Sequence, residues 1–168
     1  DKIILHKSSN KNKAYGGLGN DVIIGSKGHD FLYGGPKRNP RGKSDRDLID
    51  GRGGNDRIYD YSGEGNVLLG DKGSDHIYSL GDAVSTLRGG KGTDFLYSNG
   101  GRTKSGRIEM LFGDRGNDKL RGNQTPVNGP AYFDGGSGDD RIYGTSRDYT
   151  IIFQSGANRI QANEGDDL

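Results

Sequence analysis

Runs of nine residues with the pattern Gly-x-x-Gly-x-Asp-x-Φ-x, where Φ is a large aliphatic residue, recur along this 168-residue chain. The pattern is complete at residues 70–78 and returns nineteen residues later at residues 89–97. A repeat of fixed period is typical of a solenoid, in which each turn buries its apolar side chains against the next turn. With two nonapeptides in each turn of about 18–19 residues, the sequence predicts an all-β fold, a parallel β-helix or β-roll solenoid. We expect it to form a single domain over residues 1–168.

Two sets of units alternate along the chain and differ at the sixth position. One set keeps a carboxylate there, and its sixth positions are Asp30, Asp56, Asp75, Asp94, Asp118 and Asp140, followed by Asn158. The other set loses the carboxylate along the chain, and its sixth positions are Asp21, Asp47, Asn66, Ser85, Glu109, Ala131 and Thr150. If each turn contains one unit of each set, one edge of the solenoid is a column of aspartates and the opposite edge is not.

The eighth positions of the units predict the core. Glycines at the first and fourth positions suit a tight turn with positive φ. The residues that follow suit a short strand whose side chains alternate between two faces, with the Φ residue pointing inward. The expected core residues are Ile3, Ile23, Leu32, Ile49, Ile58, Leu68, Ile77, Leu87, Leu96, Leu111, Leu120, Phe133, Ile142, Ile152 and Ile160.

The nonapeptide pattern resembles the calcium-binding repeat of the RTX (repeats-in-toxin, hemolysin-type) family over nearly the whole chain. The resemblance implies a β-roll with Ca²⁺ between consecutive loops, about five or six ions in a row along one edge. Calcium takes its oxygen ligands from carboxylates and backbone carbonyls, and an aspartate at the end of a Gly-rich turn offers both. The expected metal ligands are Asp30, Asp56, Asp75, Asp94, Asp118 and Asp140, together with Asp21, Asp47 and Asn158.

The composition indicates that such a chain needs bound metal to fold. Hydrophobic residues make up 29% of the chain, and 32 residues are glycine, which places it near the border of disorder. There is no cysteine, so no disulfide supplies the missing stability. Calcium is abundant outside cells, and we therefore expect a secreted, extracellular or cell-surface protein. No long apolar run and no charged-then-apolar leader is visible, so we expect no membrane span.

Two outward-facing rows are also predicted. Basic residues at the third position of the aspartate-bearing turns predict a row that either offsets the carboxylates or binds an anionic polysaccharide or a neighbouring rod. These residues are Lys27, Lys72, Lys91 and Arg115. Tyrosines that follow Φ predict a ladder that either stiffens the sheet or forms a partner or sugar interface. These residues are Tyr33, Tyr59, Tyr78, Tyr97 and Tyr143.

Insertions at residues 36–43, 99–105 and 123–130 all fall in the same phase of the repeat. We expect them on one edge of the solenoid, either as a binding surface or as tolerated excursions.

No catalytic constellation is visible in the sequence. His6, His29 and His76 lie in unrelated repeat positions, and no Ser or Thr sits in a nucleophile elbow. The aspartates are better explained as metal ligands than as acids or bases. There is no separate basic domain or aromatic platform of a known type, so no nucleic acid partner is expected. We expect no enzyme within these residues.

Two functional hypotheses follow. The first is a calcium-stabilised extracellular structural solenoid, a filament or matrix subunit or the stalk segment of an adhesin. Both ends cut through a repeat, which favours head-to-tail self-association or a longer parent chain. The second is the C-terminal secretion and folding module of a toxin or hydrolase exported by a type I system. An ice-binding face is disfavoured, because the fifth positions form no regular array of Thr and Asn.

Overall fold

The computed structural model describes residues 1–6, 11–36, 45–61, 63, 65–80, 85–98, 109–122, 131–144 and 149–161, and their regular elements are sixteen β-strands in two parallel sheets. The odd sheet contains β1 (Lys2–Ile4), β3 (Val22–Ile24), β5 (Leu48–Asp50), β7 (Val67–Lys72), β9 (Thr86–Lys91), β11 (Glu109–Arg115), β13 (Ala131–Ser137) and β15 (Tyr149–Ser155). The even sheet contains β2 (Asn12–Tyr15), β4 (Asp30–Tyr33), β6 (Arg57–Asp60), β8 (His76–Ser79), β10 (Phe95–Ser98), β12 (Lys119–Arg121), β14 (Arg141–Tyr143) and β16 (Arg159–Gln161).

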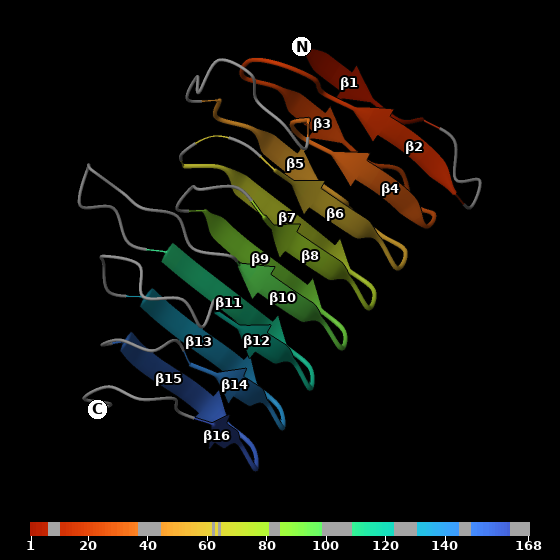
Figure 1. The fold of residues 1–168 in the computed structure, drawn as a ribbon. Coiled ribbons are helices and arrows are strands. Elements are labelled where there is room, and N and C mark those ends of the chain that lie inside the picture. The colour runs from red at the N-terminus through yellow and green to blue at the C-terminus, as the bar shows by residue number, and fades with distance from the viewer. Residues whose placement is uncertain are drawn as a thin grey trace.

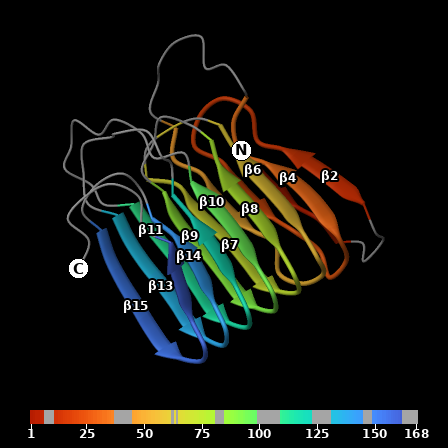
Figure 2. The ribbon, with the colours of Figure 1, turned by 60° about the horizontal axis from the view of Figure 1, so that its bottom comes forward.

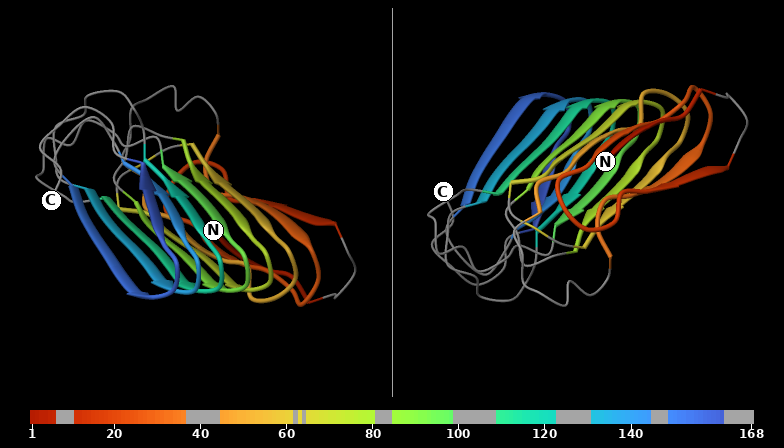
Figure 3. Two further views of the ribbon diagram at one scale, coloured as in Figure 1. Left: turned by 90° about the horizontal axis from the view of Figure 1, so that it is seen from below. Right: turned by 90° about the horizontal axis from the view of Figure 1, so that it is seen from above.

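The chain winds as a solenoid, because successive strands alternate between the two sheets. Figures 1 and 2 show the strands stacked in chain order, from β1 and β2 at one end to β15 and β16 at the other. In Figure 3 the two sheets form two layers joined along one edge by short turns. The predicted all-β parallel solenoid is therefore confirmed.

The length of a turn varies along the chain. Val67 pairs with Thr86, nineteen residues later, whereas Val22 pairs with Leu48, twenty-six residues later. The predicted insertions at 36–43, 99–105 and 123–130 all fall between an even strand and the next odd strand, and apart from Pro36 they lie outside the described residues. The short turns from each odd strand to the next even strand carry the aspartate column.

The core is one column of apolar side chains from each sheet. Strand alternation turns one residue of each short strand inward, and parallel register stacks these residues directly on each other. Fully buried members are Ile23, Leu32, Ile49, Ile58, Leu68, Ile77, Leu87, Leu96, Leu111, Leu120, Phe133 and Ile142, with Ala14 at the N-terminal end. Ile3 is partly buried against this cluster. The predicted core is thus confirmed over most of its length.

The core prediction was wrong at Ile152. β15 pairs with β13 one residue earlier than predicted, so that Phe133 pairs with Ile151 and the outward Asp134 pairs with Ile152. Ile152 is therefore 40% exposed, and Ile151 packs against the core in its place. The same shift moves Thr150 out of the predicted sixth position and onto the outer face. Ile160 keeps the register of Ile142 but is 53% exposed, because β16 has only one neighbour among the described strands.

The glycines of the turn serve two different purposes. Most fourth-position glycines have positive φ, as predicted, for example 133° at Gly73 and 143° at Gly92, whereas Gly28 does not. The first-position glycines do not, so the expectation of positive φ there was wrong. They are required because a Cβ would collide with the aspartate of the same turn, as at Gly51 and Asp56. Positive φ occurs instead at the second position, including the non-glycine residue Asp71 at 73°.

Among the described residues there is no helix that is both long enough and apolar enough to cross a membrane.

Candidate metal centre

The six aspartates of the first set form one continuous hydrogen-bonded column. The backbone N–H of each donates to Oδ1 of the equivalent residue one turn later. The N···O distances are 2.8 Å for Asp30 to Asp56, 2.7 Å for Asp56 to Asp75, 2.7 Å for Asp75 to Asp94, 2.8 Å for Asp94 to Asp118 and 2.9 Å for Asp118 to Asp140. This ladder holds the carboxylates from Asp56 to Asp140 in the same way, at the point where the turn enters the even strand.

The second carboxylate oxygen of these aspartates is buried and has no hydrogen-bond partner. This holds for Oδ2 of Asp56, Asp75, Asp94, Asp118 and Asp140. Each side chain is at most 2% exposed. A buried polar atom without a partner costs free energy, so five such atoms in one column fit the oxygen ligands of a cation along this edge.

Backbone oxygens converge on the same place as the carboxylates. A Cβ built on Gly51 would lie 2.5 Å from Oδ2 of Asp56 and 3.1 Å from the carbonyl oxygen of Gly70 in the next turn. A Cβ on Gly113 would lie 2.6 Å from Oδ2 of Asp118 and would also meet the carbonyl oxygen of Gly135. The missing Cβ of the first-position glycine thus leaves a space lined by oxygens of two kinds, from two adjacent turns.

Burial makes it costly to charge these carboxylates. Desolvation raises the pKa of Asp56 to about 8, with added repulsion from Asp75 and Asp30. It raises the pKa of Asp118 to about 8, of Asp75 to about 7 and of Asp94 to about 6. Burial also raises the pKa of Asp140. A bound cation would counter this cost, because an adjacent positive charge favours the ionised carboxylate.

The column ends in an amide at each end. At the C-terminal end, Asp140 donates its backbone N–H to Oδ1 of Asn158 at 2.7 Å. At the N-terminal end, the side-chain amide of Asn12 donates to Oδ1 of Asp30 at 2.7 Å. Asn12 was not predicted from the sequence to belong to the column, although it precedes Asp30 by eighteen residues, which is one turn of the repeat. Asp30 differs from the other members, since its Oδ2 accepts the backbone N–H of Ser26 at 2.6 Å.

The opposite edge begins with an acidic cluster. Asp21 donates its backbone N–H to Oδ1 of Asp47 at 2.9 Å, and Asp47 donates in the same way to Asn66. Oδ2 of Asp21 and Oδ2 of Asp47 are buried without a hydrogen-bond partner. Two further buried aspartates, Asp45 and Asp60, add to this cluster. Desolvation, reinforced by Asp60, Asp21 and Asp45, raises the pKa of Asp47 to about 7.

Asp45 and Asp60 were missed because they lie outside the sixth position of the nonapeptide. Strand alternation was the available signal. Asp60 directly follows the outward-facing Tyr59 on β6, and Asp45 precedes Asp47 by two residues, so both belong to the inward-facing series.

Further along the chain, the opposite edge replaces carboxylates with a direct hydrogen bond. Ser79 and Ser85, both 1% exposed, place their Oγ atoms 2.8 Å apart. Ser79 occupies the inward position that Gly34 occupies in an earlier turn, and Ser85 occupies that of Asp47. Where the glycine and aspartate are lost together, the two hydroxyls form a hydrogen bond with each other. In the next turn Glu109 is buried, and desolvation raises its pKa to about 7.

These residues fit calcium better than a transition metal. Within the described ranges, no group of three or more His, Cys, Asp or Glu side chains is placed to hold a metal ion. A site here must therefore combine one carboxylate per turn with backbone carbonyls, an all-oxygen set typical of Ca²⁺. The residues that would hold such ions on the first edge are Asp56, Asp75, Asp94, Asp118 and Asp140. On the opposite edge Asp21 and Asp47 have the same unpartnered oxygen.

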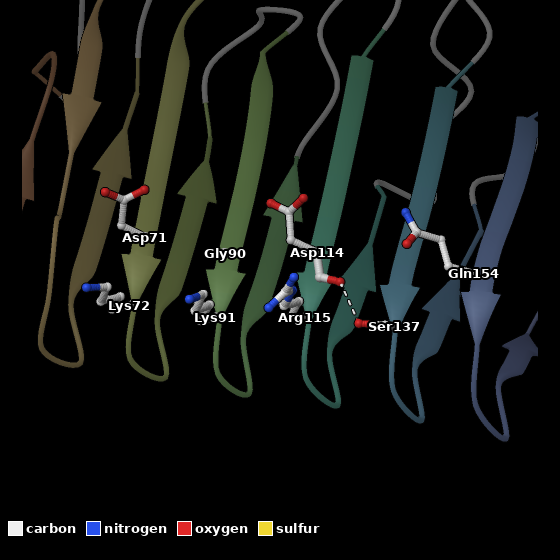
Figure 4. Close-up of a pocket in the computed structure, with 8 residues that line it drawn as sticks. All are labelled: Asp71, Lys72, Gly90, Lys91, Asp114, Arg115, Ser137 and Gln154. Atoms are coloured by element: carbon white, nitrogen blue, oxygen red, sulfur yellow. Dashed lines mark hydrogen bonds between the residues drawn. The ribbon is translucent and has the colours of Figure 1, made fainter.

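The predicted outward rows are also in place. Lys72, Lys91 and Arg115 pair in register on the odd sheet, and Lys27 is separated from them by Gly53. Figure 4 shows Lys72, Lys91 and Arg115 of this row beside Asp71 and Asp114.

The tyrosine ladder is longer than the sequence predicted. It begins at Tyr15, whose ring stacks on Tyr33 with centroids 4.7 Å apart. Tyr33 stacks on Tyr59 at 5.3 Å, and Tyr59 on Tyr78 at 4.9 Å.

Comparison with known families agrees with this architecture. The family model of the RTX calcium-binding nonapeptide repeat (4 copies) matches residues 9–36, 41–59, 84–102, 105–124, 132–148 and 154–168, which together are more than half of the chain. The matched segments leave out residues 60–83, where β7 and β8 nevertheless continue both sheets in register. No curated protein and no solved structure matches the chain. The chain therefore belongs to the RTX calcium-binding nonapeptide repeat family, and its fold is the calcium-binding β-roll of that family.

Proposed function

We propose that this β-roll is a structural segment of an extracellular protein and that it folds when calcium binds. The observation that carries the proposal is the five buried aspartates of the column from Asp56 to Asp140, each with one oxygen held by the backbone ladder and the other without a partner. A chain in which these oxygens stay unpartnered and charged pays a large desolvation cost. Calcium bound between turns removes that cost and joins adjacent turns.

Calcium concentration then decides where the chain is rigid. A site with a dissociation constant of about 0.1 mM contributes on the order of 1.4 kcal/mol at millimolar calcium, and several such sites add up. Cytosolic calcium is far too low to fill sites of this affinity. The same chain would thus stay unfolded inside the cell and become a rigid rod outside it.

A rigid rod suits a filament or matrix subunit or the stalk of an adhesin. The end strands of the described sheets, β1 and β2 at one end and β15 and β16 at the other, each have one paired neighbour. Backbone groups at such edges pair readily with another strand. We propose that the rod continues there, either into a longer parent chain or head-to-tail into a second copy.

Sedimentation velocity in millimolar calcium, over a range of protein concentrations, tests this proposal. A filament subunit is expected to grow into long particles as its concentration rises. A folded species that stays monomeric at every concentration would contradict the filament. That result would favour a segment of a larger secreted protein, such as the secretion and folding module of a toxin or hydrolase.

A further inference from the structure

The outer face of the even sheet carries two rows of side chains, which we call the basic aromatic face. The first row lies next to the tight turns, and the second row is the tyrosine ladder. Six cationic side chains belong to this face, namely Lys13, Arg57, Lys119, Arg121, Arg141 and Arg159. Six tyrosines belong to it as well, namely Tyr15, Tyr33, Tyr59, Tyr78, Tyr97 and Tyr143.

No Asp or Glu occupies an outward position on any of the eight described strands of this sheet. The chain as a whole is nearly balanced, with 24 Lys and Arg against 23 Asp and Glu. The described acidic residues of the repeats are instead turned inward or lie on the other face, apart from Asp139 on a tight turn. This face is positively charged although the protein as a whole has almost no net charge. Such a local concentration of positive charge attracts anionic ligands.

A groove follows the first row of this face along the tight turns. One segment, of about 490 Å³, is lined by residues that include Lys11, Phe31 and Arg57, and it ends at His76. The next segment, of about 680 Å³, starts at His76 and reaches Arg159. A linear polymer could therefore lie along the long axis of the rod, across successive turns.

The second segment contains most of the groove's positive charge. Its lining includes Lys119, Arg141 and Arg159, with the polar side chains of Thr93 and Asn117 on the turns. The exposed acid on its rim is Asp139, whose Oδ1 accepts the backbone N–H of Ala157 at 2.8 Å. The other carboxylates that line the groove belong to the buried column.

The rings of this face offer their edges rather than their faces to a ligand. Tyr33 and Tyr59 each lie between two parallel rings, with interplanar angles of 4° to 11°. Arg121 lies over the ring of Tyr97, and Lys119 lies over the ring of Tyr143. Single-stranded nucleic acids bind by stacking bases on open ring faces, and both ring faces of Tyr33 and of Tyr59 are already covered. Ring edges and hydroxyl groups remain, and they suit a ligand rich in hydroxyl groups.

We propose that the basic aromatic face binds an acidic polysaccharide, a linear glycan that carries carboxylate or sulfate groups. The Lys and Arg side chains pair with the acid groups, and the tyrosine hydroxyls and turn residues bond the sugar hydroxyls. The basic row on the odd sheet is a weaker candidate. Asp71 and Asp114 lie among its cations (Figure 4), and Asp114 also forms an ion pair with Arg88.

Binding of dextran sulfate to the folded chain, in calcium-containing buffer, tests the proposal, with uncharged dextran as the ligand control. The face variant combines Arg57→Gln, Lys119→Gln and Arg141→Gln. Its matched control combines Lys72→Gln, Lys91→Gln and Arg115→Gln and removes the same charge from the basic row. Loss of three exposed ion pairs is expected to weaken binding by the face variant about tenfold. The row variant is expected to bind within about twofold of the wild type.

Equal weakening in the two variants would overturn the proposal, because binding would then depend on net charge alone. Failure of dextran sulfate to bind would also overturn it. A third variant with Arg57→Lys and Arg141→Lys keeps the charge and is expected to retain binding, which separates charge loss from misfolding. Single-stranded oligo-dT is the competing polyanion. If it binds as tightly as dextran sulfate, and the face variant loses both ligands, the surface is a nucleic acid site instead.

Discussion

The backbone N–H of Asp75 donates to Oδ1 of Asp94, 2.7 Å away and nineteen residues later, while Oδ2 of Asp94 is buried without a partner. The two oxygens of one carboxylate therefore have different tasks. The first fixes the spacing of adjacent turns through the backbone. The second faces a space lined by oxygens, where a cation would bind. Substitutions that affect one oxygen and spare the other can separate the two tasks.

Asp94→Asn is expected to keep the ladder and lose the cation. An asparagine makes the same bond naturally at the end of the column, where Asn158 accepts from Asp140 at 2.7 Å. At calcium concentrations too low to fill the site, the Asn variant should therefore be at least as stable as the wild type, because a buried charge is gone. In millimolar calcium it should gain less stability than the wild type. Thermal melts with and without calcium measure both quantities.

Asp94→Ala is expected to lose both the hydrogen bond of the ladder and the ligand for the cation. It leaves the backbone N–H of Asp75 without an acceptor, which costs about 1–3 kcal/mol in addition to the lost calcium. Asp21→Ala, at the end of the opposite edge, is the control and should lower the calcium-dependent melting temperature less. Equal losses for the two Ala variants would contradict the assignment of the first edge as the principal metal column.

The metal-free chain is expected to become less stable as pH rises. Burial raises the pKa of Asp94 to about 6, of Asp75 to about 7 and of Asp118 to about 8. A carboxyl whose pKa is raised by folding binds its proton more tightly in the folded state. Stability is thus fully present below the unfolded pKa near 4 and is lost as pH rises through about 6 to 8.

Calcium is expected to reverse this trend, since it binds the deprotonated carboxylate. Melting temperatures at pH 5 and pH 8, in resin-treated buffer and in calcium, measure how stability depends on pH without and with the metal. A metal-free chain that is more stable at pH 8 than at pH 5 would show that these carboxyls are not buried as described.

Gly92→Ala is expected to disrupt the stack of turns. Gly92 has a φ of 143°, and a Cβ there would collide with the carbonyl oxygen of Gly73 in the preceding turn. Gly19→Ala provides the control, because Gly19 has a φ of 103° but no atom within 4 Å of a built Cβ. The control should cost about 1–2 kcal/mol from backbone strain alone. Gly92→Ala should cost clearly more in calcium-saturated denaturation, and equal costs would rule out the close approach of the two turns.

The hydroxyl pair of Ser79 and Ser85 is expected to stabilise its half-turn without calcium. Each single Ala substitution leaves one buried hydroxyl without its partner and should cost about 1–3 kcal/mol. The double Ala variant should cost less than the sum of the two singles. Urea denaturation at two calcium concentrations that both keep the chain folded should give the same coupling energy, and a coupling that grows with calcium would mean that the pair acts as a metal ligand.

Much of the fold could be predicted because the repeat fixes both register and burial. A residue such as Leu96 lies at the eighth position, and in a parallel stack the same position recurs on the core side of every turn. The prediction was wrong at Ile152, because β15 follows β13 at a spacing of eighteen residues and Ile151 therefore takes the core position. The same spacing separates Asp140 from Asn158, so the phase of the neighbouring aspartate set carried a signal for Ile151 that was not used.

The candidate site was predicted in part for a related reason. The sixth-position aspartates were found by phase, but Asp60 lies just after the repeat and only strand alternation turns it inward. The purpose of the first-position glycines was also hidden, because it depends on where the carboxylate of Asp56 points, which the sequence does not contain. Asn12 was missed because the first turn has no complete nonapeptide around it.

The most direct test of the account is a calcium titration of the chelator-treated chain, followed by far-UV circular dichroism. The aspartate column predicts a transition from coil to β-structure as calcium approaches millimolar concentration, with reversal on adding excess chelator. Full β-structure in excess chelator at neutral pH, unchanged by calcium, would contradict the account. The buried Oδ2 atoms of Asp56, Asp75, Asp94, Asp118 and Asp140 would then need a partner other than a metal ion.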